Sequence, residues 1–291
     1  MVDVFVTHYA RTSARQLNAV TADVVREIER ATDTRHRLTV LGWAEDDETW
    51  ADLETKLADV PGVRVVRNDR PGRPDTQPSQ RNKVLDVARG DGDEPFVLLH
   101  NDVRPARGWL DRLSRDLEWC ERRWGRGSSL VAPRYVPFHH LRDASQVWES
   151  VRAPRFVSAD EMARWCGQWG FRYEADRVCC PAWAQPIDDG HQLMMFIARP
   201  SFFDAVGPCD ETFTGINFDD SEWGMRALMA GKRNLTSQTA LVGHIESLSF
   251  GAAGPMAPTD NAQVFITKHG RELFDELDSG RIWPRLHGEQ K

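Results

Sequence analysis

Three polar side chains, His100, Asn101 and Asp102, follow directly after the apolar run Pro95–Leu99. A short apolar run of this kind predicts a buried strand, and ligands of open α/β sheets bind beyond the carboxyl ends of strands. The carboxylate of Asp102 is a hard ligand suited to Mg²⁺ or Mn²⁺. We therefore expect a cation or nucleotide site here, although Asn-Asp after a strand is also typical of an ordinary turn.

Two further groups carry matching chemistry. Asp219 and Asp220 begin a segment, residues 219–230, that has helical character, and His244 follows a predicted strand over residues 235–243. A carboxylate at the positive end of a helix stays ionised and can accept a proton from a hydroxyl. A neutral imidazole can ligate a metal. Taken singly, the acidic pair reads equally as a helix cap and the histidine as an ordinary polar residue, so the argument depends on their combination.

The elements that must position these residues alternate between strand and helix. Strands are predicted over residues 2–7, 37–41, 62–66, 95–99, 129–137, 192–198 and 235–243, and helices over 17–28, 45–57, 79–88, 109–124, 200–205, 219–230 and 260–277. This order predicts an α/β protein with a mostly parallel sheet flanked by helices. Residues 138–190 lose clear periodicity, and we interpret them as an insertion that lines a substrate site; a surface subdomain is the alternative. No linker divides the chain, so we expect a single domain over residues 1–291.

Composition excludes several classes. The net charge of −7 makes the chain a poor candidate for general nucleic-acid binding. No apolar stretch approaches the roughly 18–20 residues that cross a bilayer, and no cationic leader begins the chain. The five cysteines lack zinc spacing, which indicates reduced thiols. We expect a cytoplasmic protein without an integral membrane segment, and the oligomeric state stays open.

The motifs, taken in order, resemble the nucleotide-sugar-dependent glycosyltransferases of the GT-A fold, especially family 2. Residues 97–102, followed by Pro105 and Gly108, resemble the aspartate-rich metal motif of that family. Residues 218–226 resemble its catalytic helix, residues 79–82 its helix start before the metal strand, and residues 242–244 the strand that carries its late histidine. The resemblance implies a Rossmann-like GT-A sheet with an inserted acceptor-side segment at 138–190 and a C-terminal helix at 260–277.

The resemblance also implies roles for residues. Asp102 and His244 would ligate Mn²⁺ or Mg²⁺, and Asp220 would be the general base, with Asp219 as runner-up. The residues that would contact the nucleotide are Thr7, His8, Tyr9, Arg11, Trp43, Arg81, His100 and Asn101. Two departures stand out: His100 and Asn101 replace the aspartates usual in the family, and Gly42 with Trp43 replaces an acidic base-reading residue. Stacking of Trp43 on a base would replace that contact; the alternative is that Trp43 packs on the sheet.

The expected activity is transfer of a sugar from a nucleoside-diphosphate sugar, expected to be a UDP-sugar, to an acceptor hydroxyl with inversion at the anomeric carbon. Residues 1–110 would form the donor half and residues 111–291 the acceptor half. The acceptor stays open among a small molecule, a glycan and a macromolecule. Two alternatives are a nucleotide-sugar-binding module without turnover, which the two departures motivate, and a nucleotidyltransferase. Against the latter, no glycine-rich cationic loop lies near residue 10.

Overall fold

Four parallel strands form the N-terminal half of the central sheet. In the computed structural model, which describes residues 1–10, 16–68, 76–137, 180–181, 195–214, 218–244, 261–279, 281–282 and 285–286, this half consists of β1 (Val2–Ala10), α1 (Gln16–Ala31), β2 (His36–Ala44), α2 (Asp47–Leu57), β3 (Arg64–Arg67), α3 (Gln77–Gly90) and β4 (Phe96–His100). The strands lie in the order β3-β2-β1-β4. The predicted alternation of strand and helix in this half is confirmed.

The second half continues the same sheet with mixed directions. Its elements are β5 (Val103–Pro105), α4 (Trp109–Trp124), β6 (Ser129–Pro137), β7 (Cys180–Pro181), β8 (Phe196–Ala198), the short 3₁₀ helix η4 (Pro200–Asp204), α7 (Asp219–Met229) and β9 (Arg233–His244). From β4 the order runs β8-β6-β9-β5, with β7 also paired to β9. Strands β6 and β9 run in the direction of β1–β4, whereas β8, β5 and β7 run opposite. The sheet is therefore mostly parallel, as predicted.

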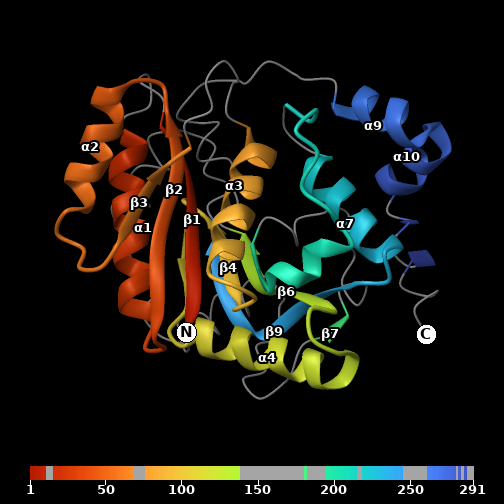
Figure 1. Cartoon of the computed structure of the whole chain (residues 1–291), viewed down its shortest axis with the longest axis horizontal. Helices are drawn as coiled ribbons and strands as arrows, with labels where there is room; N and C mark the ends of the chain where they lie inside the picture. The colour runs from red at the N-terminus through yellow and green to blue at the C-terminus, as the bar shows by residue number, and fades with distance from the viewer. Residues whose placement is uncertain are drawn as a thin grey trace.

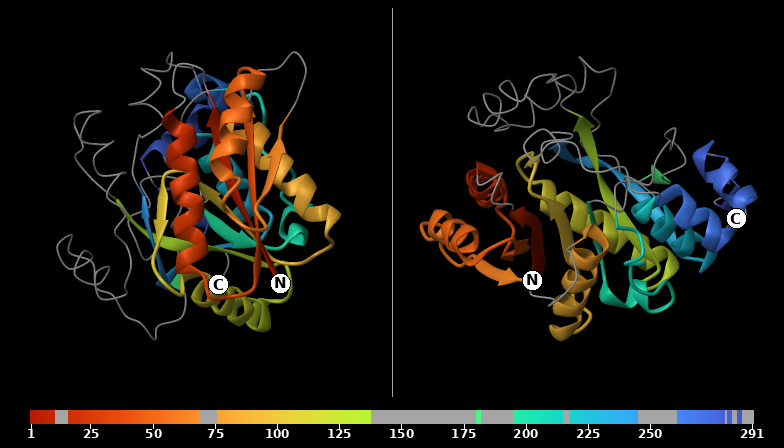
Figure 2. Two further views of the ribbon diagram at one scale, coloured as in Figure 1. Left: turned by 90° about the vertical axis from the view of Figure 1, so that its left-hand side faces the viewer. Right: turned by 90° about the horizontal axis from the view of Figure 1, so that it is seen from above.

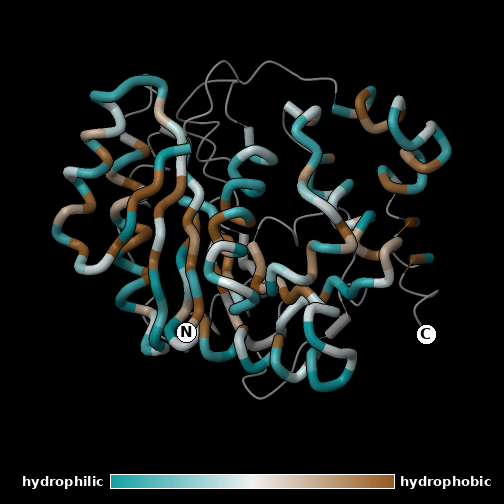
Figure 3. Tube along the Cα trace, in the orientation of Figure 1, coloured by the Kyte–Doolittle hydropathy of each residue, from teal (hydrophilic) through white to brown (hydrophobic). Residues whose placement is uncertain are grey.

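Helices cover both faces of the sheet. Side chains alternate between the faces along each strand, so both faces carry apolar side chains that helices bury. In β4, Val97 and Leu99 join a buried cluster with α1, α2 and α4, whereas Phe96 and Leu98 join a second cluster with α3, η4 and α7. Figure 3 shows long hydrophobic stretches in the central strands and hydrophilic outer turns where α4 lies. This two-faced core is the α/β architecture expected from the sequence.

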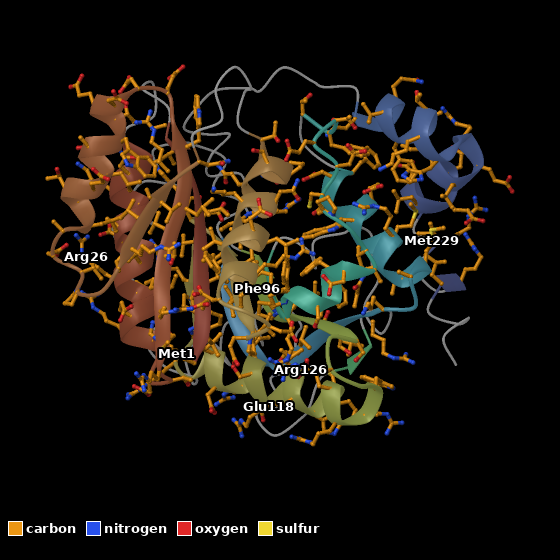
Figure 4. The ribbon with its side chains drawn as sticks, viewed as in Figure 1. Met1, Arg26, Phe96, Glu118, Arg126 and Met229 are labelled. Carbon is orange, nitrogen blue, oxygen red and sulfur yellow. The ribbon has the colours of Figure 1, made fainter. Side chains whose placement is uncertain are left out.

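The two ends of the molecule carry different helices. Figure 1 shows α1 and α2 grouped with β1–β3 on the left, α3 in the middle and α7 on the right, and Figure 2 shows the same separation from above. Phe96, labelled at the centre of Figure 4, lies between the two groups. The structure thus places α3 where it can contact both halves. None of the helices in the described part of the chain is both long enough and apolar enough to cross a lipid bilayer.

The C-terminal segment differs from its prediction. Residues 260–277 were expected to form one helix, but the structure has two, α9 (Asn261–His269) and α10 (Arg271–Asp278). Gly270 divides them with a φ of 90°, which only glycine adopts easily. Both helices pack on α7 through a third buried cluster that includes Phe213, Met225 and Phe265. Of the predicted insertion at 138–190, only residues 180 and 181 lie within the described residues.

Candidate active site

The positions of Asp102 and His244 meet at one edge of the sheet. Strand β5 pairs antiparallel with β9 so that Val103 is opposite His244, which puts the backbone of Asp102 beside the end of β9. Asp102 is only 7% exposed. Within the described ranges, no three His, Cys, Asp or Glu side chains form a metal-binding group, and the imidazole of His244 is not among the side chains described. The two positions thus adjoin, and metal ligation stays a prediction.

The strand ends predicted to bind the nucleotide are also neighbours. Thr7 on β1 is opposite His100 on β4, and Tyr9 on β1 is opposite Trp43 on β2. The Thr7 hydroxyl donates to the Leu99 carbonyl over 3.2 Å, so it reinforces the β1–β4 contact. His100 and Trp43 are half-buried. The side chain of Tyr9, together with all of Arg11, lies outside the described residues.

Gly42 explains one departure from the family pattern. A Cβ at this position would collide with the carbonyl oxygen of His8 on the neighbouring strand. The Gly42 carbonyl in turn accepts a 2.6 Å hydrogen bond from the Asn68 amide. A carboxylate side chain therefore has no space at residue 42, and Trp43 is the first side chain after it that reaches the end of β2.

His8 lies inside a polar network rather than on an open surface. Its Nε2 is 2.8 Å from Asn18 Oδ1, and its Nδ1 is 2.7 Å from the Thr21 hydroxyl and 3.1 Å from Asn101 Nδ2. Asn18 Nδ2 donates to Asp52 at 2.8 Å, so the Asn18 oxygen must accept from His8. This assigns the proton to Nε2 and leaves Nδ1 as an acceptor.

Burial makes this imidazole neutral. His8 is 1% exposed, and burial lowers its pKa to about 4, only partly offset by the hydrogen bond to Asn18. Asn101 Nδ2 also donates to the Thr21 hydroxyl at 3.0 Å. His8 and Asn101 therefore lock the ends of β1 and β4 to α1, and their predicted contacts with a nucleotide would require one of these hydrogen bonds to be exchanged.

The first turn of α3 connects the two halves. Thr76 caps this helix by accepting from the Ser79 amide. Gln80 Nε2 donates to the His8 carbonyl at 2.9 Å. Asn82 exchanges two hydrogen bonds with the backbone of Cys209, at 2.7 and 3.0 Å. Gln80 and Asn82 of α3 therefore hold β1 on one side and the loop before α7 on the other.

Arg81, which lies between Gln80 and Asn82 in α3, binds Asp219. Its Nη1 donates to Asp219 Oδ2 at 2.5 Å, and the side chains are 1% and 3% exposed. Burial opposes the charged form of Arg81, but the nearby negative charges, Asp219 foremost and then Cys209 and Asp220, together with the hydrogen bond to Asp219, outweigh it and raise the pKa of Arg81. Its Nε has no hydrogen-bond partner in the described part of the chain. Arg81 thus holds Asp219 in this conformation, and its predicted contact with a diphosphate or ribose stays a prediction.

Asp220 is the second residue of α7 and lies close to an unusual backbone conformation. Phe218 has a φ of 67°, the one non-glycine residue of the described ranges in the left-handed region. Such strain occurs often at functional sites. Asp220 is 7% exposed, and its Oδ1 accepts from the Ser221 amide at 2.9 Å. Because Asp219 is bound by Arg81, Asp220 is the carboxylate of the pair better suited to accept a proton.

Comparisons identify the fold. No protein-family model matches the chain, and no curated protein does. Solved structures do: GalNAc-T7 with UDP, GalNAc and Mn²⁺ (TM-score 0.53, 12% identity), S. aureus TarS residues 1–349 (0.54, 10%), and the mannosyltransferase PcManGT from Pyrobaculum calidifontis with GDP-Man and Mn²⁺ (0.51, 15%). The chain has the GT-A fold. Each match covers 99% of this chain, but 57%, 72% and 68% of those chains respectively.

Within this GT-A fold, the sequence missed the residues that join the halves. The resemblance of residues 79–82 to a helix start gives Gln80 and Asn82 no role, yet both make hydrogen bonds across the site. Their signal was present: four consecutive polar residues, 79–82, are all buried in the first turn of α3. A polar turn with no exposed face predicts hydrogen-bond partners elsewhere in the chain. The partners themselves, 72 and 127 positions away, have no local signal.

Proposed function

We propose that this GT-A protein is a metal-dependent glycosyltransferase that moves a sugar from a nucleoside-diphosphate sugar to an acceptor hydroxyl. The observation that carries the proposal is the β5–β9 pairing, which brings Asp102 beside His244 at the sheet edge. The similar structures of GalNAc-T7 and PcManGT contain UDP or GDP-Man together with Mn²⁺. A UDP-sugar remains our preferred donor.

Asp102 and His244 would hold the divalent ion. A carboxylate oxygen and an imidazole nitrogen suit Mn²⁺, and Mg²⁺ is the alternative if water completes the shell. The bound ion would act as a Lewis acid that offsets the negative charge of the departing diphosphate. Thr7, Trp43 and His100, at the ends of three adjacent strands, would line the nucleotide beside it.

Asp220 would be the general base. The acceptor oxygen forms a bond to the anomeric carbon while the bond from that carbon to the diphosphate oxygen breaks, and the acceptor proton passes to the Asp220 carboxylate. One displacement of this kind inverts the anomeric configuration. The N-terminal end of α7 favours the ionised form of Asp220 through the helix dipole. Asp219 would position the turn through Arg81 rather than take the proton.

A screen of UDP- and GDP-sugars tests the proposal. We expect one donor to raise the melting temperature only with Mn²⁺ or Mg²⁺, and Asp102→Ala and His244→Ala to lose that shift. Asp204→Ala, which removes an exposed carboxylate of η4, is the matched control. NMR of the product then gives the anomeric configuration, and retention would remove the base role of Asp220. Binding without transfer or hydrolysis would identify a binding module, and release of pyrophosphate a nucleotidyltransferase.

A further inference from the structure

The two C-terminal helices contact α7 on both sides of the pair Asp219–Asp220. We infer that α9 and α10 are positioning elements of the active site, which hold the first turn of α7 in the conformation that presents Asp220. The inference rests on the proposed role of Asp220 as the base. It assigns a task to α9 and α10, which pack on α7 through the third buried cluster.

Before the pair, the contact is aromatic. The Phe218 ring lies 5.3 Å from the Phe274 ring of α10 and 6.4 Å from the Phe265 ring of α9, measured between centroids. Phe265 is fully buried. A left-handed backbone is unfavourable for a residue with a Cβ, and it persists only where the surroundings determine it. The aromatic contacts supply that restraint at the residue that precedes Asp219.

After the pair, the contact is ionic. Glu222 is 0% exposed, and its Oε1 lies 2.6 Å from Lys268 Nζ and 3.0 Å from His269 Nε2, both in the last turn of α9. Arg226 of α7 itself provides a further partner at 2.9 Å. A buried carboxylate requires such partners. The negative end of the α9 dipole also favours cations at these two positions. The last turn of α9 is therefore a favourable partner for the buried Glu222 carboxylate.

Lys268 extends the connection to the loop before α7. Its Nζ also lies 2.8 Å from Asp210 Oδ2. Burial opposes ionisation of Asp210, but the bonds from Lys268 and from Thr212 lower its pKa to about 2. Asp210 follows Cys209, whose backbone α3 holds through Asn82. One lysine therefore joins α9, the first turn of α7 and the loop that α3 fixes.

The position of these contacts predicts a particular kinetic effect. Asp220 lies between Phe218 and Glu222 in the chain, so loosening either contact should displace the base. Figure 1 shows α9 and α10 beside α7 on the right, away from β1 and β2 on the left. We therefore expect kcat to fall while the KM for the donor stays near its wild-type value. A smaller folded fraction would lower the apparent kcat in the same way, so the variants are compared at a temperature well below the melting temperature of each.

Lys268→Met tests the inference, with Phe274→Ala as a second variant. The readouts are hydrogen exchange of residues 219–229 by mass spectrometry, kcat and donor KM with the sugar nucleotide that wild type consumes, and the melting temperature. We expect faster exchange in the first turn of α7 and a kcat lower by about 10- to 100-fold, the scale of a small misplacement. Lys268→Arg should restore most of kcat.

Glu276→Gln is the matched control, because its ion pair with Arg285 lies in the same C-terminal segment without reaching α7. Wild-type exchange and kcat in Lys268→Met would overturn the inference, as would a donor KM that rises in step with the loss of kcat. If wild type consumes no nucleotide sugar, the proposed function fails. The exchange comparison then still decides whether α9 holds the first turn of α7.

Discussion

The two sides of the site are stabilised by different chemistry. On the side of the strand ends predicted to bind the nucleotide, here called the donor side, the network of His8, Asn18, Thr21 and Asn101 is built mainly from neutral groups whose donors and acceptors match. Around α7, the carboxylate of Asp219 is bound by a buried guanidinium, and Glu222 is bound by cations from α7 and α9. Neutral hydrogen bonds fix the shape of the strand ends. Ion pairs neutralise the carboxylates beside Asp220 and restrain the helix that carries it.

The largest expected effect distinguishes the roles of the adjacent carboxylates Asp219 and Asp220. Asp220→Asn should lower kcat by about 10²–10⁴-fold, the typical contribution of a general base, with a melting temperature near wild type. Asp219→Asn should instead lower the stability, because it leaves Arg81 charged in the interior. Steady-state kinetics and thermal unfolding of both variants give the answer. Equal loss of kcat at unchanged stability would mean that the two residues share one role.

Removing the Arg81 guanidinium tests the ion-paired α7 side directly. Arg81→Ala should destabilise the protein by roughly 3–5 kcal/mol, since it leaves the buried Asp219 carboxylate without its partner. The free energy of unfolding in urea measures this. Arg89→Ala is the control from the same helix, because the Arg89–Asp204 pair is exposed and should contribute less than about 1 kcal/mol. Similar losses in both variants would show that the Arg81 pair is no stronger than a surface contact.

The sequence predicted most elements of both sides but few of the bonds between them. The bounds of α4 and β6 agree with the prediction, because periodicity and turn residues are local signals. Strand β5 was missed because three residues that include Pro105 carry no strand pattern, and it forms only against β9. The Arg81–Asp219 pair joins residues 138 positions apart. Such partners depend on how the chain folds back, which no local pattern records.

The hydrogen-bond network around His8 can be tested by measuring stability as a function of pH. Burial lowers the pKa of His8 to about 4 in the folded protein, from about 6.5 for a histidine exposed to water. Between these values the unfolded chain binds a proton that the folded protein excludes, so stability is highest above pH 6.5 and falls toward pH 4. The full difference is about 3 kcal/mol. NMR titration of the His8 ring, beside urea unfolding at each pH, checks it; a pKa near 6.5 would contradict the buried network.

The smallest expected effect comes from Asn101→Asp, which asks whether the donor side must be neutral. Aspartate cannot donate to His8 Nδ1, so at high pH two acceptors face each other, at a cost of about 1–3 kcal/mol. Protonating His8 turns this clash into an ion pair, so the aspartate charge raises the pKa of His8. The variant should then gain stability relative to wild type as the pH falls, and lose that gain as the pH rises through the new pKa. Asn101→Ala removes the donor without adding a charge and should show no such gain.

If Asn101→Asp and Asn101→Ala share one pH profile, residue 101 does not set the protonation state of His8. The contrast between a neutral donor side and an ion-paired α7 then loses its physical basis.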